Sequence, residues 1–244
     1  HLKIDTGMNR LGFRPEAFPD ALARLRALSV PALELRLMTH LARADERELW
    51  MTREQVAAFD HVIAAAGLTG NQRLACSIGN SAGILGWPNA HGDWVRPGLA
   101  LYGVSPFAGE SADKHGLRPV MTLETTVLTV RAVKQGETVG YAGAWRADRD
   151  SAIAILAAGY GDGLPRHLVN GTPVIIGGER HPLVGRVSMD MIAVDVTGAS
   201  QVMTGDKAIV WGAGLPVEEV AAHAGTIPYE LLCGVSQRVP LELK

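Results

Sequence analysis

The sequence predicts a chain of two halves, an α/β half with a parallel sheet followed by a mostly antiparallel β half. In the first half, strand-like apolar runs alternate with helix-like segments, which is the pattern of parallel strands joined by right-handed helical crossovers. From about residue 117 the pattern changes to apolar runs broken by Gly and Pro turns, which is typical of antiparallel strands. We place the linker at HGLRP and predict domains at residues 1–117 and 118–244.

The first half should alternate strands and helices in order along the chain. The expected strands are HLKID (1–5), PALELRLMTHL (31–41), RLACSIGN (73–80) and a run that ends at WVRPG (94–98); the expected helices are 15–28, 45–67 and the short SAGILG (81–86). In the first helix the apolar face should be formed at three- and four-residue spacing by Ala21, Leu22, Leu25 and Leu28. Gly67 should end the second helix.

The second half should consist of strands with a single clear helix. Strand-like runs lie within residues 121–133, 151–163, 172–196 and 206–212. Gly177 and Gly178 could close a hairpin between two of these strands. The helix is expected in VEEVAAHAG, residues 217–225, with Gly225 after it.

The composition excludes several classes of protein. The chain has 244 residues, 47% of them apolar and 20% charged, which is ordinary for a globular protein. A net charge of -2 argues against a nucleic-acid partner, and no apolar run reaches the roughly 18 residues of a membrane span. Two distant cysteines, Cys76 and Cys233, fit a reducing cytoplasm and indicate no cysteine metal site. Because the chain begins directly in a strand-like run, we expect it to be the C-terminal part of something longer.

Polar side chains follow each expected strand of the first half. In parallel sheets, chemistry collects at the C-terminal ends of the strands. Arg96 would place an always-charged fork at such an end, and Gly98 would let backbone N–H groups approach a phosphate. Taken alone, Arg96 fits a surface side chain before a Pro-Gly turn better than a ligand site. Taken together, the four strand ends predict a site for an anionic ligand, formed by Lys3 with Arg10, His40, Asn80 with Ser81, and Arg96 with Gly98.

Polar groups of the second half are not explained by strand patterning. They are Tyr141 in VGYAG, Tyr160 in GYGDG, Met189 and Asp190 after GRVS, and Tyr229 in TIPYE. Each could be a half-buried structural residue or a turn residue. An exposed tyrosine in a glycine loop could instead transfer a proton, if a nearby cation favours its phenolate.

Eight segments, in a constant order and spacing, resemble alanine racemase, a pyridoxal-phosphate enzyme of the fold-type III group. They run from His1 to about Arg238: HLKIDTGMNRLGF, MTHLARAD, SIGNSAGIL, VRPGLALYG, VGYAGAW, AAGYGDGLPR, VGRVSMDM and TIPYELL. The resemblance implies a (β/α)8 barrel, whose second half the four βα units resemble, followed by a C-terminal β domain. It also implies a cytoplasmic head-to-tail homodimer with active sites shared between subunits.

The resemblance implies a role for each candidate residue. Arg96 would face the pyridine nitrogen of pyridoxal 5'-phosphate; Ser81, Gly98, Leu99 and Tyr229 would bind its phosphate; His40 and Asn80 would surround Arg96. Tyr141 would be the catalytic base, reaching the other subunit's cofactor, with Arg10 beside it and beside the substrate carboxylate. Met189 and Tyr160 would line the substrate entrance. Lys3 matches a lysine that is often carbamylated in the family.

The implied activity is the interconversion of L- and D-alanine, which supplies D-alanine for peptidoglycan. One departure is large: the family attaches its cofactor through a lysine near the end of the first barrel strand. None of the lysines present, Lys3, Lys114, Lys134, Lys207 and Lys244, has that context. We therefore expect the chain alone to be inactive. The alternatives are a catalytically inert fragment or interaction module and a racemase of broader specificity. The signatures of a fold-related pyridoxal-phosphate decarboxylase are absent.

Overall fold

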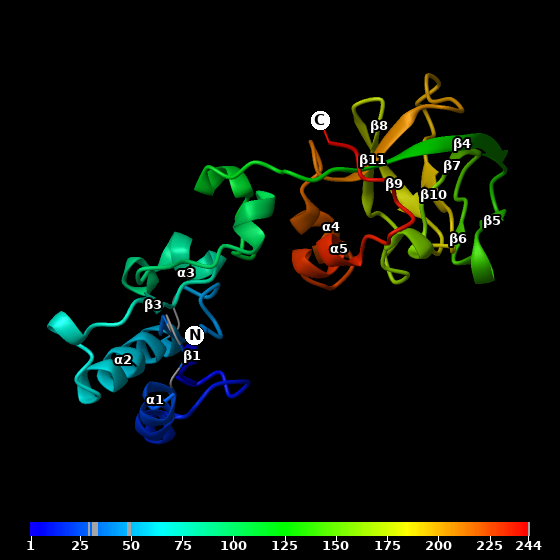
Figure 1. Cartoon of the computed structure of the whole chain (residues 1–244). Coiled ribbons are helices and arrows are strands. Elements are labelled where there is room, and N and C mark those ends of the chain that lie inside the picture. The colour runs from blue at the N-terminus through cyan, green and yellow to red at the C-terminus, as the bar shows by residue number, and fades with distance from the viewer. Residues whose placement is uncertain (29, 31–33, 48–49, 244) are drawn as a thin grey trace. The chain divides into compact units, whose positions relative to one another are not determined.

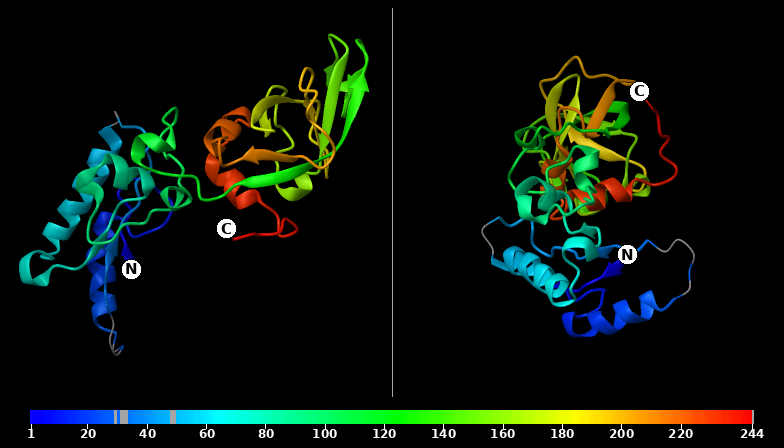
Figure 2. Two further views of the ribbon diagram at one scale, coloured as in Figure 1. Left: turned by 90° about the horizontal axis from the view of Figure 1, so that it is seen from above. Right: turned by 60° about the vertical axis from the view of Figure 1, so that its left-hand side comes forward.

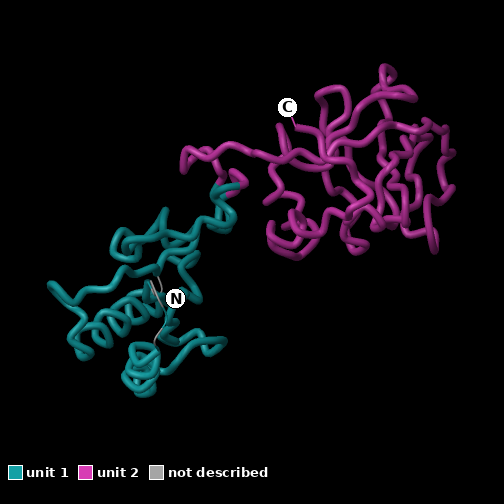
Figure 3. Tube along the Cα trace, in the orientation of Figure 1, with its two compact units in different colours: residues 1–101, 105–110 teal, residues 102–104, 111–244 magenta. Residues whose placement is uncertain are grey.

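The computed structural model describes residues 1–28, 30, 34–47 and 50–243, and these form two compact units (Figure 3). Unit 1 comprises His1–Leu101 with Ser105–Glu110, and unit 2 comprises Tyr102–Val104 with Ser111–Lys244.

Unit 1 is built on a small parallel sheet, as the sequence predicts. Its strands β1 (Leu2–Lys3), β2 (Leu37–Met38) and β3 (Cys76–Ser77) pair in that order, all parallel. Figure 1 labels β1 and β3 of this sheet. A single parallel bridge between Ser77 and Trp94 adds the fourth position. The strands are far shorter than the expected apolar runs, because the chain leaves each strand as a loop before the polar residues that follow. The sheet is therefore parallel, as expected.

The helices of unit 1 follow the expected order with changed limits. They are the 3₁₀ turn η1 (Pro15–Ala17), then α1 (Phe18–Arg26), α2 (Trp50–Ala65), η2 (Gly70–Gln72), α3 (Ser81–Gly86) and η3 (Pro88–Ala90). Leu28, expected on the apolar face of α1, is 54% exposed because the helix ends before it. After the Pro97-Gly98 turn, residues Leu99–Tyr102 form the 3₁₀ helix η4. Residues 31–33 of the expected second strand and 48–49 of the expected second helix lie outside the described residues.

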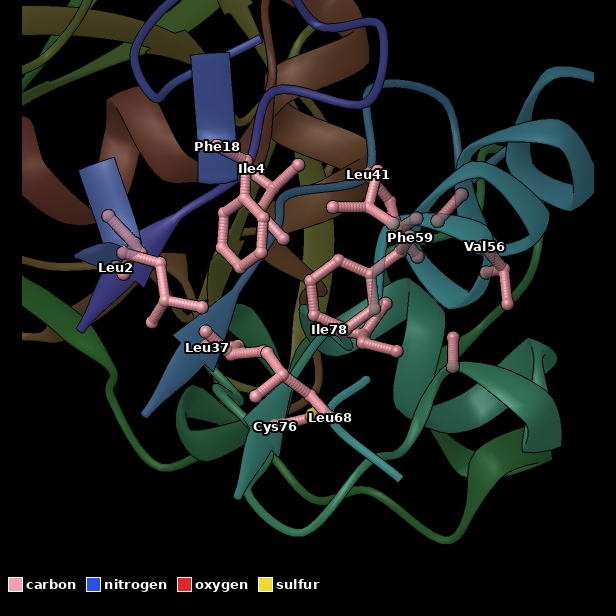
Figure 4. Packing of buried hydrophobic residues seen from close by; sticks show 14 of the residues in the cluster. Leu2, Ile4, Phe18, Leu37, Leu41, Val56, Phe59, Leu68, Cys76 and Ile78 are labelled. Carbon is pink, nitrogen blue, oxygen red and sulfur yellow. The ribbon is translucent and has the colours of Figure 1, made fainter. Parts of the chain in front are cut away.

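The core of unit 1 fills the space between the sheet and the helices α1 and α2 (Figure 4). Phe18 of α1 and Phe59 of α2 are completely buried, next to the strand residues Leu2 and Leu37. Burial of a side chain of this kind stabilises the fold by about 1.5–3 kcal/mol. This packing fixes the sheet, and so fixes the loops that follow its strands.

Unit 2 is a closed antiparallel barrel, which confirms the expected antiparallel β half. Its strands pair in the ring β10-β7-β4-β11-β8-β9, and β9 returns to β10. They are β4 (Leu123–Val133), β7 (Ser151–Leu156), β8 (Pro173–Ile176), β9 (Glu179–Val184), β10 (Ile192–Asp195) and β11 (Lys207–Trp211). Gly177 and Gly178 close the β8–β9 hairpin, both with positive φ, as predicted.

Two short helices and a two-stranded ribbon accompany the barrel (Figure 2). The ribbon is β5 (Thr138–Val139) with β6 (Trp145–Arg146). The predicted helix is α4 (Val217–His223), followed by the left-handed Gly225. The expectation of one clear helix is wrong, because α5 (Pro228–Gly234) follows, with its proline at the first helical turn, where a missing N–H costs nothing. The 3₁₀ helices are η5 (Ala112–His115), η6 (Tyr141–Gly143) and η7 (Tyr160–Asp162). Among the described residues, no helix is long and apolar enough to cross a membrane.

Candidate functional site

Arg96 is the centre of the polar cluster in unit 1. Its Nη1 donates to Ser77 Oγ at 2.6 Å. Its Nη2 donates to the carbonyl oxygens of Thr39 at 2.8 Å and Ile78 at 3.1 Å, and lies 3.2 Å from Nδ1 of His40. All four acceptors are neutral, and they come from the ends of β2 and β3. The guanidinium is therefore held in one orientation by groups that do not neutralise its positive charge.

His40 is neutral in this setting, and its tautomer is fixed. A guanidinium has no acceptor, so Nδ1 of His40 must accept from Arg96 and the ring proton must reside on Nε2. Burial, followed by the positive charges of Arg96, Arg10 and Lys3, lowers the pKa of His40 below its ordinary value. The structure thus brings four of the predicted basic residues close enough to act on one another.

The loop after β1 carries Arg10, whose positive charge acts on Lys3 and His40. The carboxylate of Asp5 accepts from the backbone N–H of Gly7 at 3.1 Å and of Asn9 at 3.0 Å, and Asn9 adopts a left-handed φ of 56°. Burial opposes the charge on Asp5, but these N–H groups outweigh it and leave the pKa below its ordinary value. Burial and the charge of Arg10 lower the pKa of Lys3. Lys3 and Arg10 therefore form a positively charged region together with Arg96, next to the tight turn that Asp5 stabilises.

The predicted phosphate-binding segment lies at the start of α3. Ser81 is buried, and its Oγ accepts from the backbone N–H of Ala100 at 3.1 Å, which places it against the segment that contains Gly98 and Leu99. Asn80 caps α3 by accepting from Gly83 N at 2.9 Å. Its amide donates to Leu41 O at 3.4 Å, which joins the start of α3 to the loop after β2 that also carries His40.

These residues fit a ligand with a heterocyclic nitrogen and a phosphate. Within the described part of the chain, no residue accepts from Nε of Arg96, and no carboxylate pairs with its guanidinium. Nε–H can therefore donate to an acceptor outside the protein, such as a pyridine nitrogen. The Ser81 hydroxyl and nearby backbone N–H groups are the donors that a phosphate requires.

In unit 2, Tyr141 lies on an exposed turn between β5 and β6. Its side chain is 65% exposed, as expected of a tyrosine in a glycine loop. Gly140 before it has a φ of 75°, and Ala142 after it has a φ of 60°, a conformation that costs a non-glycine residue energy. The turn therefore presents the phenol outward on a strained backbone.

The loops that carry Tyr160 and Met189 are joined by backbone hydrogen bonds. Tyr160 N donates to Ser188 O at 3.0 Å, and Gly161 N donates to Met189 O at 2.8 Å. A Cβ on Gly159 would lie 2.4 Å from the carbonyl oxygens of both Ser188 and Met189, so only glycine fits. Tyr160 and Met189 both keep much of their side chains exposed, as does Tyr229 on α5.

Arg238 fastens these two loops from the C-terminal segment. Its Nε donates to Asp162 Oδ1 at 2.8 Å, and its Nη2 pairs with Asp190 Oδ1 at 2.8 Å and approaches Met189 O at 3.4 Å. The hydrogen bonds that Arg238 donates to the carboxylates of Asp162 and Asp190 raise its pKa. Gly161 leaves room for the guanidinium, because a Cβ there would lie 2.6 Å from Nη2.

Sequence reasoning missed Arg238, Ser77 and Thr39. Arg238 stands at the end of the matching region, and nothing local to it indicates partners 76 residues away. Ser77 and Thr39 are hydroxyl residues inside strand-like apolar runs, which is the one local signal that could have marked them.

Models of known families match both halves of the chain. The family described as "Alanine racemase, N-terminal domain" matches residues 1–106, and "Alanine racemase, C-terminal domain" matches residues 120–243. The chain belongs to the alanine racemase family.

Individual alanine racemases agree with this assignment. The chain is 49% identical over 241 residues to the alanine racemase of Aeromonas hydrophila subsp. hydrophila, covering 99% of the chain and 66% of that protein. To the alanine racemase of Vibrio cholerae serotype O1 it is 49% identical over 240 residues, covering 98% of the chain and 65% of that protein. The chain therefore spans slightly less than two thirds of the length of these relatives.

Solved alanine racemase structures have the same fold. The biosynthetic alanine racemase of Pseudomonas aeruginosa matches with a TM-score of 0.91 and 46% identity, over 98% of this chain and 65% of that one. The alanine racemase of Bartonella henselae, with covalently bound pyridoxal phosphate, matches with a TM-score of 0.83 and 32% identity, over 97% of this chain and 64% of that one.

Proposed function

We propose that this chain carries one half of a two-base, pyridoxal-phosphate-dependent alanine racemase site. The observation that carries the proposal is Arg96, a cation held by four neutral acceptors with its Nε–H directed to none of the described residues. Because the chain spans about two thirds of its relatives, the remaining third of such a protein would supply the lysine that holds the cofactor. We also retain 117/118 as the boundary between a partial (β/α)8 barrel and the C-terminal β domain.

The residues of unit 1 would orient the cofactor. Bound pyridoxal phosphate supplies an electron sink for the α-carbon of an amino acid. Arg96 stays protonated at any working pH and cannot give up its proton, so it would keep the pyridine nitrogen unprotonated. Ser81, Gly98, Leu99 and Tyr229 would bind the phosphate, while His40 and Asn80 would fix the surroundings of Arg96.

Tyr141 would move the proton on one face of the substrate. In a homodimer with shared sites, its outward-facing hydroxyl would serve the partner's cofactor. Arg10 would favour the phenolate and bind the substrate carboxylate, and Met189 and Tyr160 would line the entrance. Lys3 would be carbamylated; its lowered pKa favours the neutral amine, which is the form that reacts with carbon dioxide.

The complete protein would then be a cytoplasmic isomerase that supplies D-alanine for peptidoglycan. The test uses the protein as its gene encodes it, assayed for interconversion of L- and D-alanine, with serine as the comparison for substrate breadth. In deuterated water, Tyr141→Phe should slow exchange from one enantiomer by about 10²–10⁴, the usual cost of a lost general base, and far less from the other. Equal and undiminished exchange from both enantiomers would show that Tyr141 is not the base. If the complete protein lacked racemase activity, the inert-module alternative would stand.

A further inference from the structure

Gln55 lies in the middle of α2, in a position where its amide has no access to water. Its side chain is 1% exposed. Oε1 accepts from the backbone N–H of Ala42 at 2.9 Å, and Nε2 donates to the backbone carbonyl of His40 at 3.1 Å. The same Nε2 lies 3.5 Å from Oγ1 of Thr6. One amide therefore bonds to the loop after β2 on both sides of Leu41 and reaches the loop after β1.

These contacts continue to the guanidinium of Arg96. Thr6 Oγ1 lies 2.7 Å from Thr39 Oγ1, and the carbonyl of Thr39 accepts from Nη2 of Arg96. The backbone of His40 is held by Gln55, while the ring of His40 contacts Nη2 of Arg96. Gln55 is thus hydrogen-bonded directly to the backbone of His40. It is linked to Thr39 through the side chain of Thr6, and it does not touch Arg96 itself.

We infer that Gln55 is a positioning residue, which sets the loops after β1 and β2 so that His40 and Thr39 present their acceptors to Arg96. For its consequence in racemisation the inference rests on the proposed function, but its geometry does not. Among side chains of this length, an amide supplies both an acceptor for Ala42 and a donor for His40 without carrying a titratable proton. A glutamate would face the carbonyl of His40 with a carboxylate, and a methionine would leave two buried backbone groups unpaired.

The electrostatic setting of His40 makes the effect measurable. The cations acting on its ring are Arg96, Arg10 and Lys3, and with burial they lower its pKa. If Gln55 holds the His40 segment, its loss should let the ring move toward water and away from Arg96. The pKa of His40 should then rise toward the ordinary histidine value of about 6.5. A merely structural role for Gln55 would lower stability without moving this titration.

The experiment is an NMR titration of the histidine rings in the protein as its gene encodes it, with His40 assigned through His40→Asn. The variants are Gln55→Met and Thr6→Val, which break the network from opposite sides, and Gln55→Glu, which keeps the shape. The matched control is Thr52→Val, also on the buried face of α2, whose hydroxyl is completely buried and has no hydrogen-bond partner among the described residues. We expect His40 to titrate at higher pH in the test variants and unchanged in the control.

An unchanged His40 titration in any folded test variant would overturn the inference, as would an equal shift in Thr52→Val. If Gln55→Met does not fold, Thr6→Val and Gln55→Glu decide. Where racemase activity is present, kcat should fall on the order of 10–100-fold in the test variants, the size seen when support for a site ligand is lost. Failure of the proposed function would remove this activity from the wild type and leave the titration result intact, so the two failures are distinguishable.

Discussion

Ser77 Oγ lies 2.6 Å from Nη1 of Arg96, and this is the shortest bond that the guanidinium makes. Ser77 is itself buried, so it cannot be replaced by water without rearrangement. Ser77→Ala should therefore destabilise unit 1 by about 1.5–3 kcal/mol, the usual value for a hydrogen bond to a charged group. Hydrogen exchange at the amide of Leu37, which bonds to Ala75 O, measures this loss.

The matched control is Ser151→Ala in unit 2. Ser151 is also buried, but its Oγ donates to a neutral acceptor, the carbonyl of Arg149, at 3.0 Å. Its loss should cost less, about 0.5–1.5 kcal/mol. Equal losses in the two variants would argue against a charged partner for Ser77.

The neutral state of His40 should make stability fall in mild acid. Its pKa is lowered in the folded chain, chiefly by burial and then by Arg96, so the unfolded state binds the proton first as the pH falls. The stability contributed by neutral His40 is full above about pH 6.5 and is lost progressively below it, toward the folded pKa. Urea unfolding between pH 5 and 8 should show this loss in the wild type and a smaller loss in His40→Gln.

His61→Gln is the control for that series. His61 is an exposed histidine on α2, so its replacement removes one imidazole and leaves the buried contacts of Arg96 in place. A His40→Gln profile as steep as that of the wild type would assign the acid sensitivity to other groups.

Arg238→Gln should loosen the loops that carry Tyr160 and Met189. The change removes the cation that Asp162 and Asp190 share, and with it the only described link from the C-terminal segment to both carboxylates. Hydrogen exchange at the amides of Tyr160 and Gly161 should accelerate, because these amides bond across the two loops. Arg180→Gln is the comparison, since Arg180 pairs with Glu219 on a different part of unit 2. Equal protection at both amides in the two variants would contradict a fastening role for Arg238.

Gly159→Ala tests the close approach of the same loops. The added Cβ would meet the carbonyl oxygens of Ser188 and Met189 at 2.4 Å, so the backbone must move apart. We expect a loss of about 1–3 kcal/mol in urea unfolding, the usual cost of overpacking. In Gly234→Ala the nearest atom, Gly163 O, would lie at 3.3 Å, so a much smaller loss is expected. A Gly159→Ala variant as stable as the wild type would show that the loops separate freely.

Patterns within a few neighbouring residues were enough to predict those elements that depend only on local sequence. The hairpin glycines at 177 and 178, Gly225 after α4 and the long strand β4 all depend on nearby residues. The polar ends of the expected parallel strands likewise placed Arg96 and His40 together, because parallel strands end at a common edge.

The parts that could not be predicted depend on contacts distant in sequence. Arg238 and Asp162 are 76 residues apart in the sequence, and α5 is too short to show a period. The sequence did contain one indication of Gln55: it is a polar residue on the same buried face of α2 as Val56 and Phe59. A polar side chain in such a stripe must find partners, and here the partners are the loops of the site.

The ring of strands in unit 2 also limits how a strand from another molecule can pair with the barrel. In an open sheet the outermost strand carries unpaired N–H and C=O groups, which invite a strand from another molecule. In the barrel, β9 pairs with both β8 and β10, so the ring closes without an outermost strand. Another chain could add to it only after one of these ladders had separated. The barrel can therefore present the loops of Tyr160 and Met189 at its surface while its own strands offer no template for aggregation.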